Sequence, residues 1–231
     1  MALADKQENN RAALTMIHAQ PFNAEAPPEA LETDITPTQL HYVRSNFPVP
    51  DHGAPFRLIV PHWYGVASVK WLKRIEVLTQ PFIGEFETGH YLYQWADRPN
   101  ERVTLMRPRA RMTDPLSGAT IRVGEPYIVR GKTWSGTSPV TNVDVSLTGE
   151  AEWLPAHLET PKGPYQWQNW SFEWVPADVG RKTLRARATD VAGNAQPEVP
   201  IWNRLGYGNN AIEVIYVDVA NPSASTTEQG P

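Results

Sequence analysis

The second half of the chain consists of short segments in which apolar and polar side chains alternate. The pattern is clearest in Val143–Thr148, Trp170–Trp174 and Leu184–Thr189. A period of two is typical of strands that bury one face, and turn residues separate the segments. Further candidate strands are Val103–Thr113, Tyr127–Trp134 and Glu213–Val219. The pattern predicts a mainly β protein with an antiparallel, immunoglobulin-like sandwich that lacks the Cys pair of antibody domains.

The composition excludes several kinds of chemistry. None of the 231 residues is cysteine, so disulfides, thiolate catalysis and Cys-based metal sites are ruled out for this chain. The six histidines show no zinc-binding spacing, and we predict no metal ligand and no catalytic residue. The net charge of −4 and the lack of a long apolar run predict neither a nucleic acid partner nor a membrane span. No signal-peptide pattern is visible, so we expect a cytoplasmic protein.

Composition shifts divide the chain into four predicted parts. Residues 1–30 are expected to form a disordered arm, 31–98 a first domain, 99–219 the sandwich and 220–231 a disordered tail. In the first domain, Thr36-Pro37-Thr38-Gln39 fits a helix-capping box with Thr36 as the N-cap, so we expect a short helix that begins at Pro37 and runs through Leu40 to about Asn46. Two extended segments are expected after it, at Arg57–Val60 and Val69–Leu78.

Residues 51–78 carry a local excess of positive charge. Four basic and two acidic side chains give this stretch a charge of +2, whereas the rest of the chain sums to −6. Cations and imidazoles near Gly53 and Gly65 could bind a phosphate or a small oxyanion. The same residues could instead be ordinary surface cations beside a tryptophan-rich core.

Several long stretches resemble the sulfite oxidase family, and they occur in that family's order. ITPTQLHYVRSNFPVP is similar to the beginning of its α+β molybdopterin domain, and DHGAPFRLIVPHWYGVASVKWLKRIEV is similar to its end. RGKTWSG, GPYQWQNWSFEW, LRARATDVAGN and WNRLGYGNN resemble its immunoglobulin-like dimerisation domain. The resemblance implies a molybdenum-molybdopterin cofactor, a small oxyanion substrate such as sulfite, and a homodimer formed through the sandwich.

The resemblance also implies which residues contact the cofactor. It assigns this role to Tyr42, Val43, Arg44, Ser45, Asn46, His52, Arg57, Ser68, Val69 and Lys70. Asn46 departs from the family, which often has a histidine there. Arg57 is suited to bind the cofactor's phosphate through two hydrogen bonds.

The segment that carries the family's molybdenum-binding cysteine is missing, because Pro50 runs directly into Asp51. The chain therefore resembles an internally deleted member, with a truncated remnant of the first domain. It is not expected to oxidise sulfite, and retention of the cofactor stays open. Three hypotheses stay open: an oxidoreductase by descent, a non-catalytic dimerisation or interaction module, and a carbohydrate-binding sandwich. The last would use Trp153, Trp167, Trp170 and Trp174 as a platform, although core packing also accounts for them.

Overall fold

The computed structural model contains two compact units. It describes residues 16–21, 29–32, 41–44, 56–77, 83–149, 152–163 and 166–221. Unit 1 contains the described residues up to Met106 together with Trp202–Asn209, and unit 2 contains Arg107–Ile201 and the described residues from Asn210 onward. Among the residues in these ranges, no helix is both long and apolar enough to cross a membrane.

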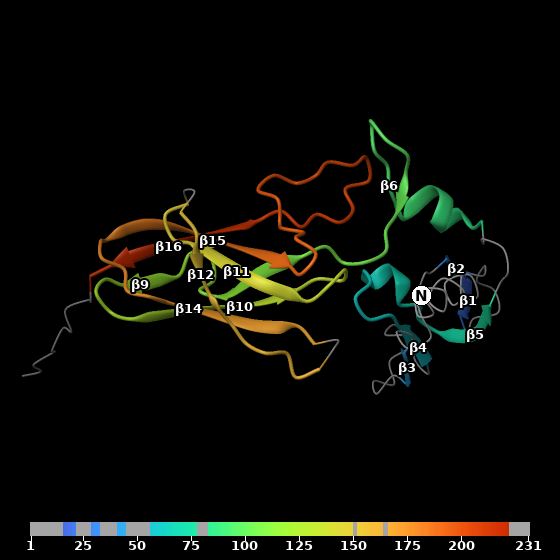
Figure 1. The fold of residues 1–231 in the computed structure, drawn as a ribbon, viewed down its shortest axis with the longest axis horizontal. Helices are drawn as coiled ribbons and strands as arrows, with labels where there is room; N and C mark the ends of the chain where they lie inside the picture. The colour runs from blue at the N-terminus through green and yellow to red at the C-terminus, as the bar shows by residue number, and fades with distance from the viewer. Residues whose placement is uncertain are drawn as a thin grey trace, which may run out of the picture. The chain divides into compact units, whose positions relative to one another are not determined.

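Unit 2 is a sandwich of two sheets (Figure 1). The four-stranded sheet has the order β13-β14-β10-β8, and its strands are β8 (Arg109–Asp114), β10 (Tyr127–Trp134), β13 (His157–Leu158) and β14 (Gln168–Trp174). The five-stranded sheet has the order β12-β11-β15-β16-β9, and its strands are β9 (Thr120–Arg122), β11 (Val140–Ser146), β12 (Leu154–Pro155), β15 (Gly180–Asp190) and β16 (Glu213–Ala220). All pairs are antiparallel except β16 with β9, which is parallel.

Alternate side chains from both sheets form the core of unit 2. Val129, Val143, Leu184 and Val217 are fully buried, as the period-two pattern requires. Trp170 is the largest buried side chain, and it lies directly opposite Gly131 in the β10–β14 register. A Cβ atom on Gly131 would overlap the Trp170 ring and the Arg111 carbonyl, so the absence of a side chain makes room for the indole.

Unit 1 contains a three-stranded sheet and two strand pairs. The sheet has the order β2-β1-β5, with β1 (Met16–Pro21), β2 (Glu29–Glu32) and β5 (Leu72–Val77). The pairs are β3 (His41–Arg44) with β4 (Phe56–Ile59), and β6 (Leu92–Tyr93) with β7 (Glu101–Arg102). The described residues of this unit also contain a 3-10 turn, η3 (Gly65–Ala67), and a π-helical turn, η4 (Phe86–His90).

A loop between β15 and β16 belongs to unit 1 rather than to the sandwich. Its first part is closed by Asn203, whose side chain is 2% exposed, donates to the Tyr207 carbonyl and accepts from the Tyr207 amide. The Arg204 amide donates to the Gln94 carbonyl at 2.9 Å. Gly208 has a φ of 64°, and a Cβ atom there would collide with the Tyr93 hydroxyl. These contacts explain Asn203 and Gly208 of the WNRLGYGNN stretch.

The predicted fold class is confirmed, and most predicted strands are present with shifted ends. The prediction of a helix from Pro37 to about Asn46 is wrong for His41–Arg44, which form β3. This segment pairs with β4 over four residues, and that pairing outweighs the capping signal of Thr36–Gln39, which lies outside the described residues. Met16–Pro21, within the predicted arm, form a strand between β2 and β5.

Candidate functional site

Three of the segments predicted to contact a cofactor lie side by side in unit 1. Tyr42, Val43 and Arg44 are on β3, and Val43 is directly opposite Arg57 on β4. The Leu58 amide of β4 then donates to the Val69 carbonyl at 2.8 Å. Segments separated by up to about 28 positions in the sequence are thus joined by backbone hydrogen bonds. We call this arrangement the β3–β4 wall, made of His41–Arg44, Phe56–Ile59 and Ser68–Lys70.

The three residues Ser68–Lys70 have different roles in the wall. The Val69 side chain is 4% exposed and packs with Leu58 and Val60 in the core of unit 1, so it stabilises the wall and does not face solvent. The Ser68 hydroxyl accepts a hydrogen bond from the Val60 amide at 3.4 Å. Lys70 is exposed and supplies a positive charge at the end of the segment. Of the three, Lys70 is suited to meet an anionic ligand.

Two residues in the left-handed backbone region flank this segment. His62 has a φ of 68° and Trp71 a φ of 54°. For L-residues other than glycine and asparagine, this conformation costs about 1–2 kcal/mol, and such strain gathers at binding and catalytic sites. The His62 carbonyl accepts from the Met106 amide at 2.8 Å, which holds the strained turn in place. The sequence alone did not indicate these positions: histidine is only moderately enriched in the left-handed region, and tryptophan is not typical of it.

The remaining predicted residues are not placed. Ser45, Asn46 and His52 lie outside the described residues, so their part in the site stays a prediction.

The donor groups of the chain do not fit a thiolate-bound molybdenum. Molybdenum held by a pterin dithiolene is a soft centre that favours a thiolate from the protein. The sequence contains no cysteine, and no group of three or more His, Asp or Glu side chains that could hold a metal occurs among the described residues. The exposed Lys70 of the β3–β4 wall suits the anionic end of a pterin, but among the described residues nothing suits the metal. No reaction step is therefore assigned to it.

The tryptophans of unit 2 do not form a flat, exposed platform. Trp170 and Trp174 are 1% and 8% exposed, which confirms that they pack in the core. The Trp153 ring faces the guanidinium groups of Arg185 and Arg187 at 4.9 and 4.3 Å. Only Trp167 of the four is largely exposed. This geometry offers little for stacking a sugar ring.

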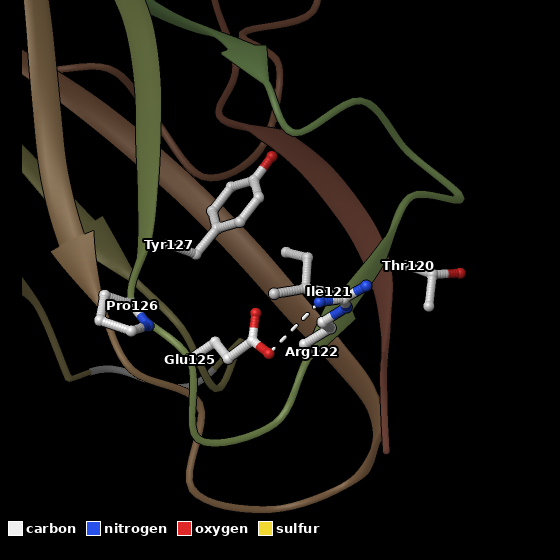
Figure 2. Close-up of a pocket in the computed structure, with 6 residues that line it drawn as sticks. All are labelled: Thr120, Ile121, Arg122, Glu125, Pro126 and Tyr127. Atoms are coloured by element: carbon white, nitrogen blue, oxygen red, sulfur yellow. Dashed lines mark hydrogen bonds and ion pairs between the residues drawn. The ribbon is translucent and has the colours of Figure 1, made fainter. Parts of the chain in front are cut away.

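A small pocket is present at one end of the sandwich (Figure 2). It has a volume of about 220 Å³ and is lined by Thr120, Ile121, Arg122, Glu125, Pro126 and Tyr127. Arg122 and Glu125 form an ion pair of 3.4 Å across it. Burial, together with a 2.7 Å hydrogen bond to Asp114, raises the pKa of Tyr127 to about 12, so this hydroxyl is a donor and not a base at neutral pH. None of the predicted cofactor residues lines this pocket.

The chain thus combines an immunoglobulin-like sandwich with a small β unit that contains the β3–β4 wall. Two family models match the chain. The Oxidoreductase molybdopterin binding domain matches residues 46–86, and the Mo-co oxidoreductase dimerisation domain matches residues 103–219. The chain therefore belongs to the family of molybdopterin oxidoreductases that includes sulfite oxidase.

Known proteins support this membership. The chain is 32% identical to nitrate reductase [NADH] 2 of Phaseolus vulgaris, over 79% of this chain and 24% of the relative. It is 31% identical to mitochondrial sulfite oxidase of Rattus norvegicus, over 78% of this chain and 36% of the relative. It thus spans only about a quarter to a third of these enzymes. The sulfane dehydrogenase SoxCD of Paracoccus pantotrophus has the same fold, with a TM-score of 0.75 over 92% of this chain and 58% of that chain, at 24% identity.

Proposed function

We propose that this chain descends from a sulfite oxidase-like oxidoreductase, does not oxidise sulfite on its own, and acts as a homodimerisation module. One observation carries the proposal. The dimerisation-domain model matches residues 103–219, which form two packed sheets, whereas the molybdopterin part offers no thiolate for the metal. The β3–β4 wall would be a remnant of the cofactor site that keeps its cations without the metal ligand. On this proposal, the segment that held the cysteine was lost between Pro50 and Asp51.

The core of unit 2 supports an independent role for the sandwich. It is formed by fifteen buried apolar residues contributed by both sheets. Burial of this kind, at about 25 cal/mol per Å² of apolar surface, is the main favourable term in folding. A domain with such a core can keep its fold and its interfaces after a neighbouring active site is lost.

The cofactor part of the proposal is tested by metal and pterin analysis of protein produced in a host that makes the cofactor. We expect molybdenum and pterin far below one per chain, and no sulfite oxidation with ferricyanide as electron acceptor. Stoichiometric molybdenum with measurable turnover would refute it.

The dimer part is tested by sedimentation equilibrium at micromolar concentrations. We expect the mass of two chains. The mass of a single chain would refute the dimerisation role and would leave the cofactor result unchanged. The two parts of the proposal are therefore refuted by different measurements.

A further inference from the structure

The outward face of β8 and β10 carries a concentration of positive charge. On β8 the residues Ala110 and Met112 are buried, and on β10 Val129 and Thr133 are buried. Their neighbours in the alternating pattern point away from the core. These outward residues include Arg109, Arg111, Arg130 and Lys132, which we call the cationic face.

The cations of this face are only partly neutralised. Arg111 lies directly opposite Lys132, and like charges in that position destabilise a sheet by a few tenths of a kcal/mol to about 1 kcal/mol. Arg130 pairs with Asp114 at 3.4 Å. The Lys132 ammonium donates to the Asn169 side chain at 2.9 Å, and that side chain donates in turn to the Glu159 carboxylate at 2.9 Å. In the part of the chain that the structure describes, no carboxylate pairs with Arg111 or Lys132. The face is basic although the whole chain has a net charge of −4.

An aromatic pair borders the cationic face. Trp134 is directly opposite Arg109, and its ring stacks on that of Trp167 with centroids 4.5 Å apart. Trp167 is 49% exposed. Arginine and tryptophan are the residue types most enriched at the energetic centres of protein interfaces.

Protection of the sheet edge does not account for these charges. Charged side chains commonly prevent a free edge strand such as β8 from pairing with other chains. Here the Ala110 amide already donates to the buried Gln196 side chain, and Asn210 donates to the Pro108 carbonyl at 3.0 Å. Arg130 and Lys132, moreover, are on β10, which has β14 and β8 on either side.

We propose that the cationic face and the Trp134–Trp167 pair bind an acidic segment of a partner protein. The cations supply charge complementarity, which speeds association and selects the partner, and the tryptophans supply apolar area. Proteins that bind duplex DNA tightly make about 6–10 phosphate contacts. The cationic face has fewer cations than that, and Arg130 is already paired with Asp114, so a protein segment fits better than a nucleic acid.

The experiment uses the full chain and a fluorescent peptide of glutamates around one tyrosine, followed by fluorescence anisotropy at low ionic strength. We expect binding that weakens with added salt and falls by about tenfold or more in Arg111→Glu/Lys132→Glu. In this variant the two opposed residues still carry like charges, so the repulsion between positions 111 and 132 is kept. A change in peptide binding therefore reports the sign of the charge on the cationic face. Trp167→Ala is expected to weaken binding several-fold while leaving the charges in place.

The matched control is Arg122→Glu/Arg181→Glu, which makes the same charge change at two exposed arginines of the other sheet. It should bind the peptide nearly as well as the unchanged protein. Circular dichroism checks the fold, and Arg111→Gln/Lys132→Gln replaces the reversal if that variant does not fold.

Four results would overturn the proposal. They are no binding of the peptide, an equal loss in the control, tighter binding of single-stranded DNA or heparin than of the peptide, and conversion of a dimer to a monomer by the charge reversal. The last would make the face a contact between two copies of this chain. Peptide binding is measured whether or not the chain dimerises, so failure here is distinct from failure of the proposed function.

Discussion

At the scale of single residues, Asp190 organises the turn after β15. Its carboxylate is 2% exposed and accepts hydrogen bonds from the Ser135 hydroxyl at 2.9 Å and from the Asn194 amide at 3.0 Å. The Asn194 side chain donates to both carboxylate oxygens. Burial alone would raise the pKa of Asp190, but these donors favour the charged form, and the pKa is lowered overall.

We therefore expect Asp190 to make stability pH-dependent on the acid side. Because the pKa is lower in the folded than in the unfolded chain, its contribution is full above the unfolded value of about 3.9 and is lost as the pH falls through the folded value. Asp190→Asn should lower the free energy of unfolding at neutral pH by about 1–3 kcal/mol. It should also reduce the fall of this free energy as the pH is lowered, which is the acid limb of the stability curve. Urea titrations between neutral pH and pH 3 measure both. The exposed Asp178→Asn is the control, and an unchanged acid limb in Asp190→Asn would contradict the prediction.

Gln196 links the two sheets through its buried amide. Its side-chain oxygen accepts from the amides of Ala110 and Ala188, and its NH₂ group donates to the Asn210 carbonyl at 3.0 Å. Gln196→Ala would leave three buried groups without these partners, at about 1–3 kcal/mol each. We expect chemical denaturation to show that Gln196→Ala lowers the free energy of unfolding by about 3 kcal/mol or more. The control Gln166→Ala, at an exposed position, should lower it by less than about 0.5 kcal/mol. Equal effects of the two substitutions would show that water replaces the Gln196 amide.

The role of a single residue was predictable from the sequence only where the residue belonged to a recognisable motif or pattern. The resemblance placed Arg57 and Ser68–Lys70 in one site, and the structure brings these segments together, although it does not test their contact with a cofactor. Nothing in the sequence marked Gln196 as buried, because a glutamine in a turn-rich stretch is usually exposed. The left-handed His62 and Trp71 depend on tertiary contacts that no local pattern reports.

At the scale of elements, the β10–β14 pair depends on close approach of a strand to an indole. We expect Gly131→Ala to destabilise the sandwich by about 3 kcal/mol, near the upper end for overpacking, because the new methyl group would overlap the Trp170 ring. Gly163→Ala is the control, since a Cβ atom there meets nothing within 4 Å. Thermal unfolding of the two variants makes the comparison, and similar midpoints would mean that Trp170 can move aside.

Strands were predictable when alternation was strict, and β10 coincides with its predicted range Tyr127–Trp134. The two-residue strands β12 and β13 are too short to show any period. The strand β3 was missed for a different reason. Its neighbours suggested a helix cap, and its extended form depends on pairing with β4, twelve or more residues away in the sequence.

At the scale of the whole molecule, dimerisation should appear in the thermodynamics of unfolding. If two chains associate only when folded, mass action stabilises the folded state, and the midpoint temperature rises with protein concentration. We expect calorimetry at two concentrations about tenfold apart to show an upward shift of a few degrees. A midpoint independent of concentration would indicate that the folded chain is monomeric.

The loop Trp202–Asn209 has a consequence for the order in which the protein is made. The chain leaves the sandwich after β15, contributes this loop to unit 1, and returns to form β16. Because β16 lies between β15 and β9 in the five-stranded sheet, β9 has no partner in that sheet until β16 is in place. During synthesis on the ribosome, the sandwich cannot close until residues near Ala220 have emerged from the exit tunnel. Such late, long-range pairing slows folding, so nascent chains should depend on chaperones until β16 has emerged.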